Sequence, residues 1–152
     1  TILVVVATAT IFGRVLTIAQ IPAMIIDLLE GITNNYIVLL ILINIMLLIV
    51  GCIVDTTAAI IILAPMLYPL IMAYGVDPIH FGLIMVLNLA IGLCTPPVGA
   101  NLFVSSGLGD LPFNTVARHV LPFLVVMLLV LIIVTFVPSV TLFIPEMMGL
   151  IK

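Results

Sequence analysis

The sequence has 152 residues, of which 66% are hydrophobic and only 6% are charged, and its formal net charge is −3. Soluble domains are about 45–50% apolar and about 25% charged, so this chain has too few polar residues to cover a core in water. Its three Lys and Arg residues also exclude the positively charged surface that nucleic-acid binding requires. We therefore predict an all-α integral membrane protein, surrounded by a lipid bilayer.

The first region, residues 1–34, contains two short apolar stretches, Thr1–Phe12 and Ile21–Leu29, on either side of Gly13 and Arg14. They predict a truncated helix and a shorter helix, which we assign to a scaffold or to an arm that connects to it. Because the chain begins within an apolar stretch, without Met and without a positively charged leader, we expect it to be the C-terminal part of a longer polypeptide.

The second region, residues 35–75, is apolar almost throughout but gathers polar residues and glycine at its centre. These central residues are Gly51, Asp55, Thr56 and Thr57. Divided there, each arm has about 15 residues, and a helix of that length rises ~22 Å, which is short of the ~30 Å hydrocarbon core. We therefore predict a re-entrant hairpin. Two ordinary tilted spans joined by a tight turn at the surface are the alternative. Asn44, in the first arm, is a candidate to bond across helices.

Asp55 is the only charged residue between Glu30 and Asp77, and a carboxylate inside a membrane must be paired, hydrated or neutralised. Three roles are open. It can cap the second arm of the hairpin, help to hold an ion, or meet a basic group from another part of the polypeptide. We favour capping because Asp is a good N-cap residue, which would place Thr56 and Thr57 in the first helical turn.

The third region, residues 76–110, predicts one membrane crossing that is broken in the middle. Asp77 and Pro78 suit the N-cap and the first position of a helix over residues 80–93, and a second helix is expected over residues 100–108. The segment GLCTPPVG, residues 92–99, separates them. Neither helix is long enough to span a bilayer alone. We expect His80, in the first helical turn, to lie at the membrane interface without a catalytic role.

The two prolines of the break have a specific chemical consequence. Pro96 and Pro97 have no N–H group, so they cannot bond to the carbonyl oxygens of Gly92 and Leu93. The sequence therefore predicts two unpaired carbonyl oxygens at mid-membrane depth, beside the Thr95 hydroxyl. Such oxygens are hard ligands, suited to a small hard cation such as Na⁺.

The helix that restarts after the break has its own binding potential. It begins near Val98, and the positive end of its dipole suits an anionic group. Asn101 lies in its first turn and is a candidate to face a substrate. The alternative for the whole segment is a proline kink that serves packing alone.

The last region, residues 111–152, contains an apolar stretch over Leu121–Val137 that predicts an ordinary membrane-spanning helix followed by a tail. Pro122 lies near the expected start of this helix and Pro138 at its end. The two cysteines of the chain both lie inside apolar stretches, and we expect them to be small buried hydrophobic residues.

Several stretches of the sequence resemble the large membrane subunit of tripartite ATP-independent periplasmic (TRAP) transporters, in its C-terminal half. The resemblance covers nearly the whole chain. It rests on GCIVDTTAAIIILAP from residue 51, GVDPIHFGLIMVLNLAIGLCTPPVGANLFV over residues 75–104, LPF over residues 121–123 and VPSVTLFIP over residues 137–145. The hairpin segment and IGLCTPPVG are its most specific parts.

The resemblance implies a Na⁺-driven secondary transporter, not an enzyme, that imports organic anions across the inner membrane of bacteria or archaea. It implies an elevator-type fold of inverted repeats, each with one hairpin and one broken helix, in which the hairpin of residues 35–75 opens to the periplasm. The implied partners are the N-terminal half of the same subunit, a separate or fused small membrane subunit, and a periplasmic binding protein that delivers the anion.

In this family Na⁺ lies between the hairpin tip and the helix break. Carried over to this sequence, the implied Na⁺ ligands are the backbone oxygens of Gly51, Gly92 and Val98, with Thr95 as a further ligand. The candidates for substrate binding or coupling are Asp55, Thr56 and Asn101. Candidate substrates include C4-dicarboxylates, sialic acid, other sugar acids and keto acids.

Three other functions fit part of the pattern. An intramembrane hydrolase of the aspartyl type would need two carboxylates in one site, and Asp55 has no second acid in its apolar stretch. A passive channel can also contain broken helices, but its flux would not need Na⁺. A related Na⁺- or H⁺-coupled carboxylate or ion transporter with the same repeats would work without a binding protein.

Overall fold

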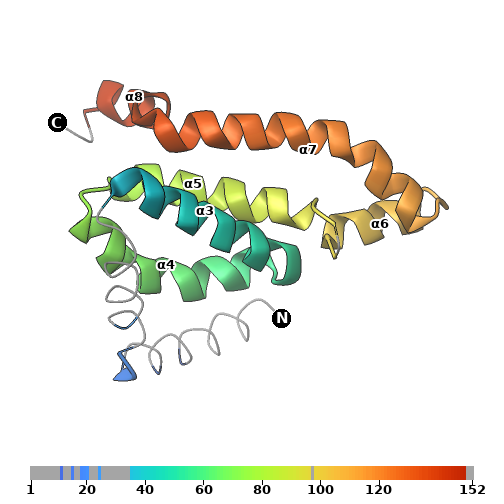
Figure 1. The fold of residues 1–152 in the computed structure, drawn as a ribbon, viewed down its shortest axis with the longest axis horizontal. Helices are drawn as coiled ribbons and strands as arrows, with labels where there is room; N and C mark the ends of the chain where they lie inside the picture. Colours follow the sequence, from blue (N-terminus) through green and yellow to red (C-terminus); the bar gives the residue numbers. More distant parts are fainter. Residues whose placement is uncertain are drawn as a thin grey trace.

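The structure is a computed structural model, and it describes residues 11, 15, 18–20, 24, 35–96 and 98–149. The helices expected within residues 1–34 therefore fall almost entirely outside the described residues. Over the residues that are described, the chain forms helices joined by turns and short irregular segments, with no strand. The all-α prediction is confirmed, and Figure 1 shows how helices α3 to α8 follow one another.

A two-residue turn joins α3 (Tyr36–Ile53) to α4 (Thr56–Ala73), and each helix has 18 residues. The arms are longer than predicted because α3 continues as helix through Gly51 up to the turn. At 1.5 Å per residue each arm rises ~27 Å, and α3 and α4 are each long and apolar enough to cross a membrane. The length argument for a re-entrant hairpin was therefore wrong, because helices of this length also fit two tilted spans.

An aspartate caps α4, and another caps the next helix along the chain, α5 (Pro78–Leu93). The Asp55 carboxylate accepts hydrogen bonds from the backbone N–H groups of Thr57 (2.9 Å) and Ala58 (3.4 Å) at the start of α4. Asp77 does the same at the start of α5, with bonds of 2.8 and 3.2 Å. These bonds satisfy N–H groups that have no partner within their own helix. The capping role that we favoured for Asp55 is confirmed.

The predicted break separates α5 (Pro78–Leu93) from α6 (Ala100–Leu108). Gly99 ends the break in the left-handed region of backbone space, at φ 52°, where side chains are strained. A Cβ atom at this position would also lie 3.0 Å from the carbonyl oxygen of Thr95. The restart of the helix therefore requires glycine here.

The long helix α7 (Phe113–Phe136) has 24 residues and begins eight residues before the predicted start at Leu121. That prediction was wrong because Pro122 lies inside the helix rather than near its first turn. A proline inside a helix removes one backbone hydrogen bond, and membrane helices tolerate this loss. Pro138 follows the end of α7, as predicted, and opens α8 (Pro138–Met147).

α5 is the helix around which the others pack. Figure 1 shows the α3–α4 pair on one side of α5 and α7 on the other, with α8 beside the beginning of α5. The core between the hairpin and α5 consists of Leu39, Leu40, Ile43, Leu47, Ala59, Leu67, Leu70, Ile71, Val76, Phe81, Met85 and Leu89. A smaller apolar cluster of Ile91, Leu124 and Leu131 joins α5 to α7.

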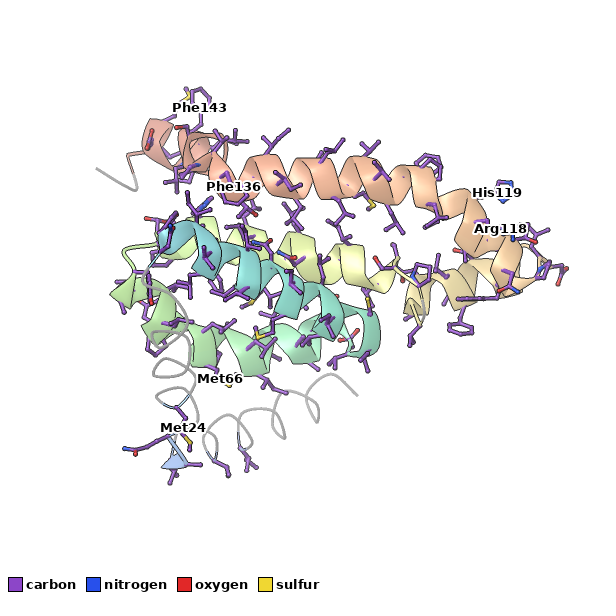
Figure 2. The ribbon with its side chains drawn as sticks, in the orientation of Figure 1. Met24, Met66, Arg118, His119, Phe136 and Phe143 are labelled. Carbon is purple, nitrogen blue, oxygen red and sulfur yellow. The ribbon has the colours of Figure 1, made fainter. Side chains whose placement is uncertain are left out.

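Much apolar surface is left uncovered by this packing, above all on α7. Phe123, Val126 and Leu129 are each more than half exposed, and Figure 2 shows side chains that project from both sides of this helix. Lipid or further membrane helices would cover such a face. Figure 2 also places Arg118 and His119 near the beginning of α7, beside α6, and Phe136 at its other end.

Candidate ion and substrate site at the hairpin tip

Two glycines bring the backbone of the hairpin into contact with the backbone of α5. Gly51 lies near the end of α3, Gly92 lies near the end of α5, and both are buried. A Cβ atom added to Gly92 would lie 2.5 Å from the carbonyl carbon of Gly51 and 2.6 Å from its Cα. One added to Gly51 would lie 2.9 Å from the Cα of Leu89. Only glycine allows this approach, so the structure places the hairpin tip beside the helix break, as predicted.

The break is closed more tightly than the sequence indicates. The carbonyl oxygen of Gly92 accepts a hydrogen bond of 2.9 Å from the N–H group of Thr95. The prediction that Pro96 leaves this carbonyl unpaired was therefore wrong, because a tighter turn replaces the lost helical bond. The N–H group of Cys94 is also directed at this oxygen and at that of Ile91, so the Gly92 carbonyl has partners within the turn. Pro97, which we expected to free the second carbonyl, lies outside the described residues.

Two threonine hydroxyls follow the glycines of the contact in the sequence, Thr95 three residues after Gly92 and Thr56 five residues after Gly51. Thr95 Oγ1 donates its hydrogen to the carbonyl oxygen of Ile91 at 2.7 Å, and its lone pairs remain as acceptors. Thr56 Oγ1 is buried and has no hydrogen-bond partner in the described part of the chain. Leaving such an atom unpaired costs about 1–3 kcal/mol, and a bound ion or a ligand donor would offset that cost. Among the described residues no group of three or more His, Cys, Asp or Glu residues could hold a metal ion, so the ligands offered here are neutral oxygens.

The other predicted residues lie around the restart of the helix. Val98 and Asn101 are exposed, and so is the Asp55 carboxylate that caps α4. Asn101 Nδ2 donates to Cys94 Sγ across the break, at 3.6 Å. Cys94, expected to be a small buried hydrophobic residue, is thus only partly buried and serves as a weak acceptor. Of the predicted residues, the structure brings Gly51 and Gly92 into direct backbone contact, and Thr95 follows Gly92 by three residues.

A second group of polar residues, which the sequence indicated only through Asn44, joins α3, α5, α7 and α8. Asn88 Nδ2 donates to Asn44 Oδ1 at 2.7 Å, and Thr135 Oγ1 donates to the same oxygen at 3.3 Å. His80 Nδ1 lies 2.7 Å from Thr141 Oγ1, and His80 Nε2 lies 3.3 Å from the carbonyl oxygen of Thr135. We call these five residues the polar cluster. Asn44 and Asn88 each lie within an apolar stretch, but the sequence did not show how these residues pair.

The structure shows that the His80 ring is buried within the protein, at 1% exposed. Its position at the membrane interface stays a prediction. α8 packs over the beginning of α5 and covers the ring. An interface position was inferred from the first helical turn alone, and the contact that buries the ring comes from a residue 61 positions later in the chain.

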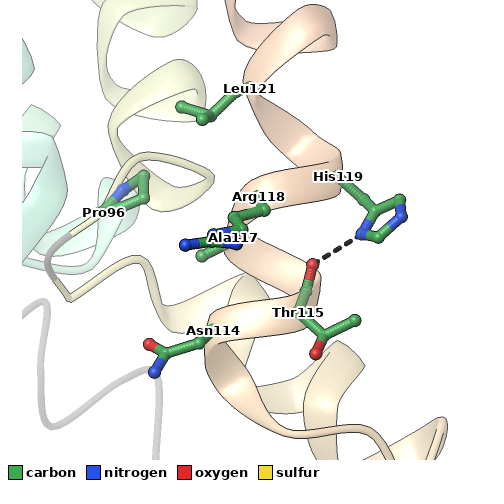
Figure 3. A pocket seen from close by; sticks show the side chains of 7 residues that line it. All are labelled: Pro96, Asn114, Thr115, Ala117, Arg118, His119 and Leu121. Carbon is green, nitrogen blue, oxygen red and sulfur yellow. Dashed lines mark hydrogen bonds between the residues drawn. The ribbon is translucent and has the colours of Figure 1, made fainter.

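A cavity of about 690 Å³ lies between the break and the beginning of α7. Its lining residues are Pro96, Asn114, Thr115, Ala117, Arg118, His119 and Leu121. Figure 3 shows the Asn114 and Arg118 side chains on the side of α7 that faces Pro96, and the His119 ring on the other side. The His119 ring is tied to the carbonyl oxygen of Thr115 at 2.8 Å. The sequence did not indicate this cavity, because it depends on how α7 packs against the break.

Residues 1–140 match the family described as "Tripartite ATP-independent periplasmic transporter, DctM component". The chain is also 46% identical, over 93% of its length and 22% of the relative's, to the isethionate TRAP transporter permease protein DctMQ of Oleidesulfovibrio alaskensis. It is 44% identical to the sialic acid TRAP transporter large permease protein SiaM of Vibrio cholerae, over 91% of this chain and 32% of that one.

A third relative is the C4-dicarboxylate TRAP transporter large permease protein DctM of Pseudomonas aeruginosa. It is 44% identical over 96% of this chain and 34% of its own length. The chain therefore spans between about a fifth and a third of the length of these relatives. That share is smaller than the half of a subunit that the resemblance suggested.

Proposed function

Because this chain belongs to the DctM-component family of tripartite ATP-independent periplasmic transporters, as part of a large membrane subunit, we propose that it helps to import a small organic anion by Na⁺-coupled secondary transport. The relatives are named as transporter permeases, which favours transport over an enzymatic role. We place the chain in a multi-pass subunit of a bacterial or archaeal inner membrane. Its partners would be the rest of that subunit, a separate or fused small membrane subunit, and a periplasmic binding protein that delivers the anion.

The backbone contact between Gly51 and Gly92 carries the proposal. It supports the proposal because backbone of two different elements meets there, three residues before Thr95. Na⁺ would take ligands from the oxygens of Gly51, Gly92, Thr95 and Val98, of the hard type that it prefers. The buried, unpaired hydroxyl oxygen of Thr56 is a further reason to expect a ligand at the tip.

Coupling would follow from the position of the ion between two elements. An ion that binds only when tip and break are in contact stabilises that contact. The anion would then bind beside it, near Thr56, Asn101 and the positive N-terminus of α6, with Asp55 holding the first turn of α4. An elevator movement of the hairpin and the broken helix would carry both across the membrane.

The test is uptake by proteoliposomes that contain the complete transporter, with isethionate, succinate and sialic acid as the probes. We expect at least one of them to enter only with an inward Na⁺ gradient and the cognate binding protein. Uptake driven equally well by a proton gradient would contradict Na⁺ coupling. Uptake that does not need the binding protein would favour a related carboxylate transporter that works alone.

A further inference from the structure

We propose that Arg118 forms a carboxylate-binding subsite in the cavity between the helix break and α7, where the transported anion binds before or after it occupies the tip. The proposal rests on the proposed function, because it assumes that the cargo is an anion. It concerns a different element from the residues at the tip, since Arg118 lies on α7 and the tip is formed by α3, α4 and α5.

The geometry of α7 directs two polar side chains into this cavity. Asn114 and Arg118 are four residues apart and therefore lie on one face of the helix, and Figure 3 shows both on the side of Pro96. Ala117, on the same face, leaves space beside them. A guanidinium has five N–H donors in a planar fork that matches a carboxylate, and a neighbouring amide can add one more bond.

The charge of Arg118 is not neutralised in the described part of the chain. It is the only Lys or Arg residue among the described positions. No hydrogen bond or ion pair connects it to another described residue, including the four acids Asp55, Asp77, Asp110 and Glu146. Because α7 begins only five residues earlier, the side chain lies ~7.5 Å along the helix from its start. An unpaired cation beside a 690 Å³ cavity is better explained by a role in binding an anion than by a role in helix packing.

The cavity also lies beside the break, and its lining includes the residue that follows Thr95. Pro96 lines it, and Pro96 follows Thr95, the hydroxyl residue of the tip contact. An anion that leaves the tip on this side of the break would therefore meet the guanidinium next. The competing explanation is a membrane-end charge that binds lipid phosphate, which also attracts arginine.

The experiment measures binding without relying on transport. The complete transporter with Ala117→Cys is labelled with N-ethylmaleimide in vesicles, while succinate, isethionate or sialic acid is added. The same protein without the new cysteine gives the background labelling. Arg118→Gln is compared with Arg118→Gln/Leu108→Arg, which restores the charge at an exposed position at the end of α6 that does not line this cavity.

We expect at least one probe to slow the labelling. The half-protecting concentration should rise about tenfold or more in Arg118→Gln, because hydrogen bonds to charged groups are worth about 1.5–3 kcal/mol and each tenfold change is 1.4 kcal/mol. The double variant should stay as weak as Arg118→Gln. Arg118→Lys keeps the charge but loses the paired bonds, so its half-protecting concentration should lie between those of the unsubstituted protein and Arg118→Gln. This second variant keeps the test valid if Arg118→Gln folds poorly.

Three outcomes overturn the subsite. These are no protection by any probe, an unchanged half-protecting concentration in Arg118→Gln and Arg118→Lys, and full recovery in the double variant. Protection that requires phosphatidylglycerol vesicles and not the added anion would assign the cavity to lipid phosphate instead. A preparation with Na⁺-driven uptake but no protection removes only the subsite, whereas protection without Na⁺-driven uptake removes only the Na⁺ coupling.

Discussion

α3 and α5 meet at two places that are built from different groups. At the hairpin tip, Gly51 and Gly92 place backbone against backbone, with no side chain between them. About two turns earlier on α3, Asn44 and Asn88 meet through a side-chain hydrogen bond of 2.7 Å inside an apolar core. The first contact depends on the absence of side chains and the second on their polar atoms.

The difference indicates a division of roles. The polar cluster uses most of its donors and acceptors within the chain, and Asn88 Oδ1 is its one buried side-chain atom without a partner in the described residues. Such bonds hold helices in one register inside a membrane. At the tip, the hydroxyl oxygens of Thr56 and Thr95 can still accept a ligand. We infer that the cluster fixes how the helices pair and that the tip responds to the ion.

The largest effect should come from Gly92→Ala. The added methyl group would meet the backbone of Gly51, which cannot move aside as a flexible side chain can, so we expect a loss of about 3 kcal/mol in stability and no Na⁺-driven uptake. Gly82→Ala on the same helix is the matched control, because its Cβ would meet no atom within 4 Å. Thermal unfolding and proteoliposome uptake measure both effects. Normal uptake by Gly92→Ala would show that the tip does not need the close contact.

Thr95→Val should weaken the ion site while leaving assembly intact. It removes one hydroxyl ligand, and we expect the Na⁺ concentration for half-maximal uptake to rise about tenfold, which corresponds to ~1.4 kcal/mol. Thr95→Ser keeps the hydroxyl and its bond to Ile91, so it should stay near the wild-type value. An unchanged Na⁺ dependence in Thr95→Val would remove this residue from the site.

Asp55→Ala should lower stability by about 1 kcal/mol, because the start of α4 loses its N-cap. Asp55→Asn keeps a capping oxygen but has no charge, so it should retain most of its stability and its Na⁺ dependence. The measurements are thermal unfolding and Na⁺-dependent uptake of both variants. If a well-folded Asp55→Asn protein lost Na⁺-driven uptake, the carboxylate would belong to coupling rather than to capping.

The smallest effect should come from the polar cluster. A double-mutant cycle of Asn44→Val and Asn88→Val should give a coupling energy of about 0.6 kcal/mol, the average measured for hydrogen bonds between membrane helices. Unfolding in detergent measures it. The Na⁺ concentration for half-maximal uptake should not change in the single variants. A clear shift in that concentration would show that the cluster takes part in ion binding and would end the division of roles.

The local parts of this fold could be predicted because neighbouring residues determine them. Asp55 and Asp77 mark the starts of α4 and α5, because their side chains bond to nearby backbone N–H groups. The prolines and glycines of residues 92–99 interrupt the helix through their own backbone chemistry. The approach of the hairpin to the break was also predicted, but only the resemblance to a known family suggested which glycines would meet.

By itself, the sequence determined the class of the protein and the position of the break. The apolar composition suits lipid rather than water, and proline and glycine interrupt a helix through local backbone effects. Only the tertiary structure decided that Gly92 keeps a bonded carbonyl, that α8 buries His80, and that Arg118 faces Pro96 across a cavity. The burial of His80 and the position of Arg118 depend on packing between elements far apart in the chain. The bonded carbonyl of Gly92 depends on how tightly the turn after α5 closes, because the same residues allow several turn geometries.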